Sequence, residues 1–484
     1  MGGARPASAG VNLPDTWPGF ADSLMRAKAH TGLDDSVTFR LVDESDARAV
    51  VVTGHFAFLG GSMGVAHGDT VLRALDTAAE HECAIVFVTS SGGARTQEGF
   101  DALIQMPRII AAMRRVRQRG LPVISVFRHP TTGGVHASYG AAADVIVAEA
   151  GATVGFAGPR VLEAFTSVTV DPRRSHTAEA YFDHGLVDEV VPVGDGLAAA
   201  LAWVRRLAPG SFTEASARRE TTATDAVTTP DTTLTGWAAV ERARAPMRPS
   251  ARRVASFLLT DLRETRGDRT GIDDPVVLAG FGRFAGIPVT VIGTDREAAG
   301  PSGTVGAPHA SGFRKAARVV RLAARLNLPV LSIVDTRGAD ATPGSDNAGL
   351  TAAVSELMQA LLDCSTPTLC AVTGEGGSGG AVAFASTDVL VMQDDSIFEV
   401  IAPEGAAAIL YRDAKRADAA AAQMELDAPS LHHRGFADAV TPGPTTAGVF
   451  PSLALLRAEL RVQLGELLPL DAGALQDRRQ DRYA

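Results

Sequence analysis

Short hydrophobic runs alternate with longer segments of helical periodicity in two parts of the chain. The first part contains three runs typical of strands buried on both faces, at 84–88 (AIVFV), 122–126 (PVISV) and 144–148 (DVIVA). Between the first two runs, apolar residues recur at near-helical spacing from Phe100 to Val116, and Gly120 follows as a stop signal. This order predicts a β-α-β unit.

The second part repeats this layout. Its strand-like runs lie at 330–334 (VLSIV), 368–372 (TLCAV) and 388–392 (DVLVM), with a helix-like segment around 350–362. The glycines repeat as well, because Gly92 and Gly133 are 41 residues apart, and so are Gly338 and Gly379. An internal duplication is the economical explanation.

Each part carries a paired-glycine turn between a predicted strand and an Ala-rich, helix-like segment. The turns are Gly133-Gly134 and Gly379-Gly380. Glycines at a helix N-terminus let backbone N–H groups approach a ligand, and the helix dipole favours negative charge there. We therefore predict two oxyanion-binding turns. The alternative is that these glycines only permit close packing of a helix against a strand.

The second turn also matches the G-x-S-x-G pattern of a serine hydrolase, with Ser378 as the nucleophile. Five of the seven residues 374–380 are glycine, which makes such a match almost inevitable. The spacing of the repeat pairs Ser378 with Thr132, and the residues around the two positions differ. We therefore expect the turn to act through its backbone and not through the serine hydroxyl.

Composition changes between the two parts, where a stretch rich in Thr, Ala, Arg and Pro has no sustained period. We predict domains at 1–208 and 250–484, joined by a linker at 209–249. A chain of 484 residues with 46% hydrophobic and 21% charged residues is long enough for two globular domains.

Charge and cysteine content exclude several classes of protein. The net charge of −10 argues against a general nucleic-acid binder. Three widely separated cysteines form neither a disulfide framework nor a CxxC zinc site. No apolar run approaches the roughly 18–20 residues of a membrane span. We expect a cytoplasmic protein with no membrane contact and no bound metal.

Longer motifs resemble those of a known family. Four segments are similar to the β subunit of acetyl-CoA carboxylase carboxyltransferase: HFAFLGGSMG (55–64), SSGGARTQEG (90–99), TTGGVHASYG (131–140) and GFAGPRV (155–161). Four others resemble the α subunit: RGDRTGIDDPVVLAGFGRFAGIPVTVIG (266–293), GAPHASGFRKAARVVRLAARLNLPV (306–330), GEGGSGGA (374–381) and IAPEGAAAILYRDA (401–414). The chain therefore resembles a fusion of a β-type and an α-type subunit.

This resemblance implies an α/β fold with two crotonase-like β-β-α superhelix domains in tandem. It implies an enzyme that moves a carboxyl group from carboxybiotin to the α-carbon of acetyl-CoA or another short acyl-CoA, giving malonyl-CoA or a substituted malonyl-CoA. The chain has no Met-Lys-Met biotinylation motif and no Gly-rich ATP-binding domain. A biotin carboxylase and a biotin carboxyl carrier protein would therefore act in trans, on a homodimer or larger homo-oligomer.

The resemblance also implies roles for individual residues. Gly133 and Gly134 would bind the thioester enolate oxygen, and Gly379 and Gly380 the biotin ureido oxygen. Residues expected beside the acyl-CoA are Gly92, Gly93, Ala94, Arg95, Gly155 and Phe156. Residues expected on the biotin side are Gly338, Gly376, Gly377 and Ser378. For Arg95, anchoring of its own loop is the alternative to a contact with phosphate.

Two departures from the family pattern leave alternatives open. No four-cysteine zinc ribbon precedes Cys83, and residues 335–344 (DTRGADATPG) replace the α-subunit pattern DTPGAYPG. Arg337 and Asp340 therefore lie near the expected biotin side, unless they pair with each other in a solvated loop. The rival functions are a biotin-independent malonyl-thioester decarboxylase of the same superfamily and a scaffolding pseudo-enzyme subunit.

Overall fold

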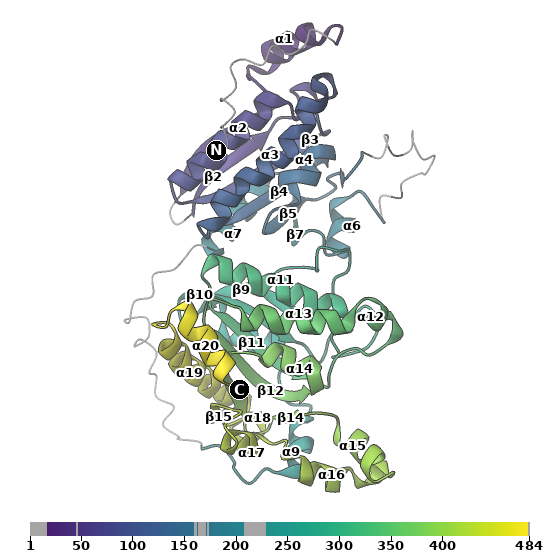
Figure 1. The fold of residues 1–484 in the computed structure, drawn as a ribbon, viewed down its shortest axis with the longest axis vertical. Helices are drawn as coiled ribbons and strands as arrows, with labels where there is room; N and C mark the ends of the chain where they lie inside the picture. Colours follow the sequence, from purple (N-terminus) through teal and green to yellow (C-terminus); the bar gives the residue numbers. More distant parts are fainter. Residues whose placement is uncertain are drawn as a thin grey trace, which may run out of the picture. The chain divides into compact units, whose positions relative to one another are not determined.

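The computed structural model describes residues 17–44, 47–158, 162, 171, 174–207 and 229–482. The chain divides into two compact units (Figure 1). Unit 1 comprises Met1–Tyr181 with Val190–Val204, and unit 2 comprises Phe182–Glu189 with Arg205–Ala484. About half of the predicted linker, at 209–228, lies outside the described residues. Its later part contains α9 (Gly236–Ala243), which belongs to unit 2.

The sheet of unit 1 has the strand order β1-β2-β3-β4-β5-β7, and β6 pairs with β4. Strands β1 and β2 are antiparallel, whereas β2 to β5 run parallel. The bounds are β1 Val37–Glu44, β2 Ala47–Gly54, β3 Ala84–Ser91, β4 Val123–Thr132, β5 Val145–Glu149, β6 Val154–Gly155 and β7 Glu189–Val191. Helix α3 (Gly99–Gln118) connects β3 to β4, so the predicted β-α-β unit is confirmed.

Helices α2 (Val65–Glu80) and α3 cover one face of this sheet (Figure 1). Their apolar stripes meet β3 in a buried cluster that includes Val71, Leu75, Ile109, Met113 and Phe87. Burying each such large side chain contributes roughly 1.5–3 kcal/mol, so this cluster fixes the sheet against the helices.

The sheet of unit 2 has the order β15-β13-β12-β11-β10-β9-β8, and β14 pairs with β12. Strands β8, β9 and β10 are antiparallel, and β10 to β13 and β15 run parallel. The bounds are β8 Thr260–Glu264, β9 Val277–Phe284, β10 Ile287–Thr294, β11 Val330–Thr336, β12 Thr368–Gly377, β13 Val389–Gln393, β14 Ile397–Glu399 and β15 Ala439–Thr441. The strands predicted at 330–334, 368–372 and 388–392 are thereby confirmed.

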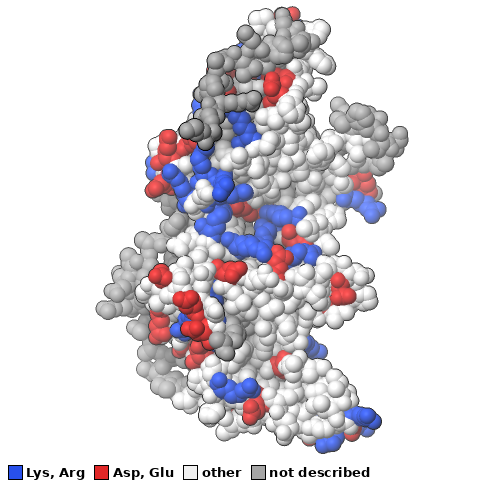
Figure 2. Space-filling model, viewed as in Figure 1, with Lys and Arg blue, Asp and Glu red and all other residues white. Residues whose placement is uncertain are grey.

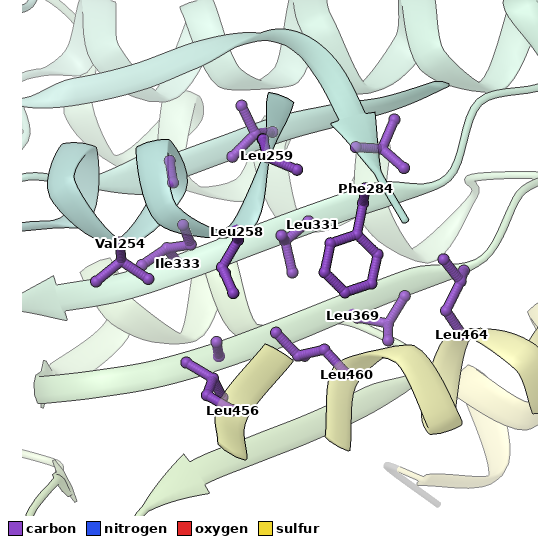
Figure 3. Close-up of a cluster of buried hydrophobic side chains, with 14 of the residues drawn as sticks. Val254, Leu258, Leu259, Phe284, Leu331, Ile333, Leu369, Leu456, Leu460 and Leu464 are labelled. Carbon is purple, nitrogen blue, oxygen red and sulfur yellow. The ribbon is translucent and has the colours of Figure 1, made fainter. Parts of the chain in front are cut away.

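Helices lie on both faces of the second sheet. Helices α11 (Ala310–Leu326) and α13 (Leu350–Leu362) cover one face, and α10 (Ala251–Leu258) and α19 (Val449–Leu467) cover the other. Figure 3 shows Leu456, Leu460 and Leu464 of α19 directed at Leu331 and Leu369 of the sheet, and all five side chains are buried. On the face of unit 2 seen in Figure 2, acidic and basic side chains lie interspersed.

Strands β3 and β4 correspond residue by residue to β11 and β12, but not in the register that the sequence predicted. Ser91 pairs with Thr131 as Thr336 pairs with Gly376. Thr132, paired with Gly155, thus corresponds to Gly377, the partner of Glu399. The predicted equivalence of Thr132 with Ser378 is therefore wrong by one residue, and Ser378 corresponds to Gly133.

Backbone angles agree with this register, since φ is +61° at Gly133 and +56° at Ser378. Adjacent glycines caused the error, because Gly93 and Gly134 are also 41 residues apart. The first repeat also holds one more residue between its turn and the next strand, and the π-helical segment His136–Gly140 accommodates it.

Candidate active site

The first glycine turn closes the carboxyl end of β4 in unit 1. Thr132 ends the strand, and α4 (Gly133–Val135) begins directly after it. The loop that follows β3 lies against this turn, because a Cβ on Gly133 would lie 2.7 Å from the Gly93 Cα atom. The positive φ of Gly133 also strains any larger residue there.

Two backbone N–H groups remain available to a ligand at this turn. The N–H of Gly133 donates to the carbonyl oxygen of Phe156 at 3.0 Å, because β6 extends the ladder of β4. Among the described residues, the N–H groups of Ala94 and Gly134 have no acceptor. The predicted donor Gly133 is thus occupied in this structure, and Ala94 is the donor that sequence reasoning placed only at the pocket border.

Arg95 anchors the loop that follows β3. Its guanidinium forms ion pairs with Asp35 at 2.7 Å and with Glu98 at 2.8 Å, and it donates to the Ser62 carbonyl oxygen at 2.8 Å. The side chain is 1% exposed. The Nε group donates to the Ser62 hydroxyl at 3.1 Å, so no donor of Arg95 is left for a substrate phosphate. These contacts belong to the loop-anchoring alternative.

A histidine extends this buried network. The Nδ1 atom of His67 lies 2.8 Å from the Ser36 hydroxyl, and its Nε2 atom lies 3.0 Å from the Tyr139 hydroxyl. Burial lowers the pKa of His67 to about 3, so the ring stays neutral and holds these hydroxyls in place. His67 is therefore not a base that titrates near neutral pH.

The other residues predicted on the acyl-CoA side border the same turn. The Gly92 N–H donates to the Gly60 carbonyl oxygen at 2.9 Å. A Cβ on Gly155 would lie 2.7 Å from the His176 ring, so this glycine is required by packing. The Phe156 side chain is 76% exposed. Residues 159–161 of the GFAGPRV segment lie outside the described residues.

The second turn begins α14 (Ser378–Ala385) in unit 2. The N–H groups of Ser378, Gly379 and Gly380 are the first of the helix and have no acceptor within it. Ser378 and Gly379 are exposed. Together they form one wall of a cavity of about 640 Å³, whose other lining residues include Val382, Phe398, Glu399, Val400, Met424, Leu431 and Phe436. The cavity is mainly apolar, with the helix N-terminus at its edge.

The remaining glycines predicted on the biotin side are required by packing, except Gly338, where the φ of +130° favours glycine. A Cβ on Gly380 would lie 2.5 Å from the Ala339 nitrogen, and one on Gly376 would lie 2.5 Å from the Phe398 ring. A Cβ on Gly377 would overlap the backbone of Arg337, and one on Gly338 would lie 3.4 Å from the Gly377 carbonyl oxygen. Of the predicted donors Gly379 and Gly380, only Gly379 lines the cavity.

Arg337 and Asp340 do not pair with each other. Asp340 is 2% exposed and accepts hydrogen bonds from the Thr342 N–H at 3.1 Å and the Thr304 hydroxyl at 3.4 Å. The exposed Arg337 donates to Glu375 at 3.2 Å. The predicted mutual pairing is wrong because the loop turns at Gly338 and buries Asp340 against its own backbone.

Glu399 is a site residue that the sequence reasoning missed. It is 4% exposed, and neither of its carboxyl oxygens has a hydrogen-bond partner among the described residues. Burial raises the pKa of Glu399 to about 7, and the nearby carboxylates Glu375 and Glu404 act in the same direction. A charged residue within the apolar run of β14 was the one signal in the sequence.

Neither a triad nor a metal site occurs in the described part of the chain. No hydrogen bond joins the Ser378 hydroxyl to a base there, and no group of three His, Cys, Asp or Glu side chains could hold an ion. Among the described helices, none is both long and apolar enough to cross a membrane.

Comparison with known proteins identifies the family. Residues 208–484 match the family model described as acetyl co-enzyme A carboxylase carboxyltransferase-like. The acetyl-coenzyme A carboxylase carboxyl transferase subunits beta/alpha of Salinispora tropica is 38% identical over 484 residues, covering 98% of this chain and 85% of that protein. The chain belongs to the acetyl-CoA carboxylase carboxyltransferase family. The Parafrankia relative of the same name is also 38% identical, covering 98% of this chain and 81% of that protein.

Solved structures agree on the fold. The transcarboxylase 12S crystal structure superposes with a TM-score of 0.72 at 20% identity, covering 89% of this chain and 82% of that one. A single-chain, multi-domain long-chain acyl-CoA carboxylase superposes with a TM-score of 0.69 at 19% identity, covering 90% of this chain and 42% of that one. The predicted α/β fold with two crotonase-like domains is thereby confirmed for this carboxyltransferase.

Replacing Ser378 separates hydroxyl chemistry from backbone chemistry in this carboxyltransferase. Ser378→Ala should leave carboxyl transfer within a few-fold of wild type, and Ser378→Gly should raise the unfolding free energy by about 1 kcal/mol by relieving the left-handed backbone. Steady-state kinetics and thermal melts check both expectations. A loss of more than roughly a thousandfold in Ser378→Ala would restore the hydrolase hypothesis.

Glu399 should make stability depend on pH. Because its folded pKa exceeds the unfolded value, the folded state holds the extra proton between about pH 4.5 and 7, and the carboxyl costs stability as pH rises through this window. The free energy of unfolding of Glu399→Gln, taken relative to wild type, should therefore rise by on the order of 2–3 kcal/mol between about pH 5 and pH 8. Thermal melts at both values measure this gain.

Glu404→Gln is the matched control, because Arg244 lowers the pKa of that carboxyl. Its stability relative to wild type should stay level or fall over the same pH range. If the stability difference between Glu399→Gln and wild type does not change with pH, the result would contradict the raised pKa of Glu399.

Proposed function

We propose that this chain transfers a carboxyl group from carboxybiotin on a separate carrier protein to the α-carbon of acetyl-CoA or another short acyl-CoA. Membership of the family makes it the carboxyltransferase component of a biotin-dependent acyl-CoA carboxylase. The observation that supports our residue-level assignment is the repeated turn, with uncommitted backbone N–H groups at Gly134 in unit 1 and at Gly379 in unit 2.

Unit 1 would stabilise the acyl-CoA enolate. Carboxylation at the α-carbon passes through a thioester enolate, whose oxygen carries the negative charge. Ala94 and Gly134 would donate their N–H groups to this oxygen, and one such preorganised donor is worth about 3–4 kcal/mol. Arg95 contributes indirectly, because its buried ion pairs hold the loop that carries Ala94 in a fixed position.

Unit 2 would bind the biotin ring. The bicyclic ring is apolar apart from its ureido group, and the cavity beside α14 combines apolar walls with the N-terminal N–H groups of Ser378 and Gly379. When bound, carboxybiotin supplies an activated carboxyl group on a ureido nitrogen. Gly379 would donate to the ureido oxygen, the dipole of α14 would stabilise negative charge there, and Val382, Phe398 and Leu431 would exclude water.

We extend the proposal to partners from the family. A biotin carboxylase and a biotin carboxyl carrier protein would act with this chain in trans. The transcarboxylase 12S structure is described as a hexamer assembly with substrate bound to a multienzyme core. By analogy we propose a homo-oligomer that works in the cytoplasm.

Valine substitutions at the two turns test the division of roles. Gly379→Val should lower carboxyl transfer from malonyl-CoA to free biotin by about a hundredfold or more, because the side chain would block the donor at the cavity. Gly134→Val should lower the same transfer, because a Cβ there would lie 3.3 Å from the Met106 sulfur and 3.4 Å from the Met63 methyl group and would displace the turn that carries the enolate donor. Production of carboxybiotin and acetyl-CoA is measured for each variant.

Gly465→Val is the matched control, because this exposed glycine of α19 has no atom within 4 Å of an added Cβ. It should leave the transfer rate unchanged. Loss of malonyl-CoA without any carboxylation of biotin, unaffected by Gly379→Val, would contradict the proposal and favour the biotin-independent decarboxylase.

A further inference from the structure

We infer that Glu399 is an electrostatic residue of the biotin side, which must keep its carboxyl group neutral during carboxyl transfer. This inference rests on the proposed function, because it concerns the charge that develops at the ureido oxygen. It adds a residue with a defined protonation state to a site built mainly from backbone groups and apolar side chains.

The fold places Glu399 beside the helix N-terminus. Strand β14 ends at Glu399, which lies in register with Gly377 of β12, the residue directly before α14. Glu399 also belongs to the lining of the cavity that Ser378 and Gly379 border. Glu399 thus lies beside the proposed ureido oxygen site, with both of its carboxyl oxygens buried.

The cations around Glu399 are already engaged by other carboxylates. Arg244 forms ion pairs with Glu375 at 2.7 Å and with Glu404, and Arg337 pairs with Glu375 at 3.2 Å. Glu375 is itself buried and lies on the neighbouring strand β12. A second buried carboxylate beside Glu375 is unfavourable, so Glu399 retains its proton.

The more distant charged residues of the cavity wall also have partners. Glu425 pairs with Arg434 at 3.6 Å, and Arg482 pairs with Asp438 at 2.8 Å. Among the described residues, no ion pair or hydrogen bond reaches the Glu399 carboxyl group from any of the elements that pack around it. An ionised Glu399 would therefore be an uncompensated negative charge in an apolar wall.

Such a charge would oppose the reaction. As the carboxyl group leaves, negative charge builds up on the ureido oxygen, and the N-terminus of α14 stabilises it. A nearby carboxylate repels this charge in surroundings that screen it poorly. Holding a proton on Glu399 removes the repulsion, whereas rising pH restores it.

The activity test is the ratio of Glu399→Gln to wild type in carboxyl transfer from malonyl-CoA to biotin, measured across pH. The amide cannot ionise, so the variant should retain its rate where wild type loses it, and the ratio should rise about tenfold between about pH 6 and pH 8. Taking the ratio cancels ionisations elsewhere in the protein and in biotin. Glu404→Gln should show no such rise.

A second measurement uses the protein alone. The infrared difference between wild type and Glu399→Gln should contain a protonated carboxylic acid band that disappears as pH rises through about 7. The same difference for Glu404→Gln should show the loss of an ionised carboxylate over this range, because Arg244 lowers the pKa of Glu404.

The possible failures are distinguishable. If wild type carboxylates biotin but the ratio of the Glu399→Gln rate to the wild-type rate does not change with pH, the role of Glu399 is overturned and the proposed function stands. The absence of the acid band would have the same meaning. If wild type carboxylates no biotin at any pH, the proposed function fails, and this inference fails with it.

Discussion

Two loops meet at the carboxyl end of each sheet with almost no space between them, and this steric constraint governs both turns. In unit 1, Gly93 and Gly133 approach so closely that neither tolerates a Cβ without displacement. In unit 2, Gly377 and Gly380 lie against residues 337–339 in the same manner. A backbone held this tightly presents its N–H groups in a fixed direction, which is the property that an oxyanion site requires.

Each loop is held by a buried ion pair, and the two units use different residues for it. In unit 1, Arg95 pairs with Asp35 and Glu98; in unit 2, Arg248 pairs with Asp335 at 3.1 Å, and Asp335 accepts the Glu375 N–H at 3.0 Å. Burying charges costs solvation energy, so such pairs add little net stability. Their value lies in fixing the loops that would face the substrates in the proposed function.

The sequence was sufficient to predict three strands in each part of the chain, the helix between β3 and β4, the duplication and the family. These follow from periodicity and from long motifs, which do not depend on distant contacts. The register between the repeats could not be read reliably, because adjacent glycines satisfy two alignments equally well. The extra residue at His136–Gly140 becomes visible only as a π-helical turn in the structure.

Other features of the site depend on contacts between segments far apart in the sequence. The occupied N–H of Gly133 depends on β6, and the protonation of Glu399 depends on Glu375, Arg244 and Glu404, which come from three other elements. Local pattern contains no information about such neighbours. The pairing predicted for Arg337 and Asp340 failed for the same reason, since Glu375 and the loop's own backbone supply their partners.

A crystal structure of the enzyme with an acyl-CoA and biotin would test the central claim most directly. The claim is that the duplicated turns bind two different oxygens through their backbones. The account predicts the thioester oxygen about 3 Å from the Ala94 and Gly134 nitrogens, and the ureido oxygen about 3 Å from the Gly379 nitrogen. Binding of either oxygen by side chains away from these turns would contradict it.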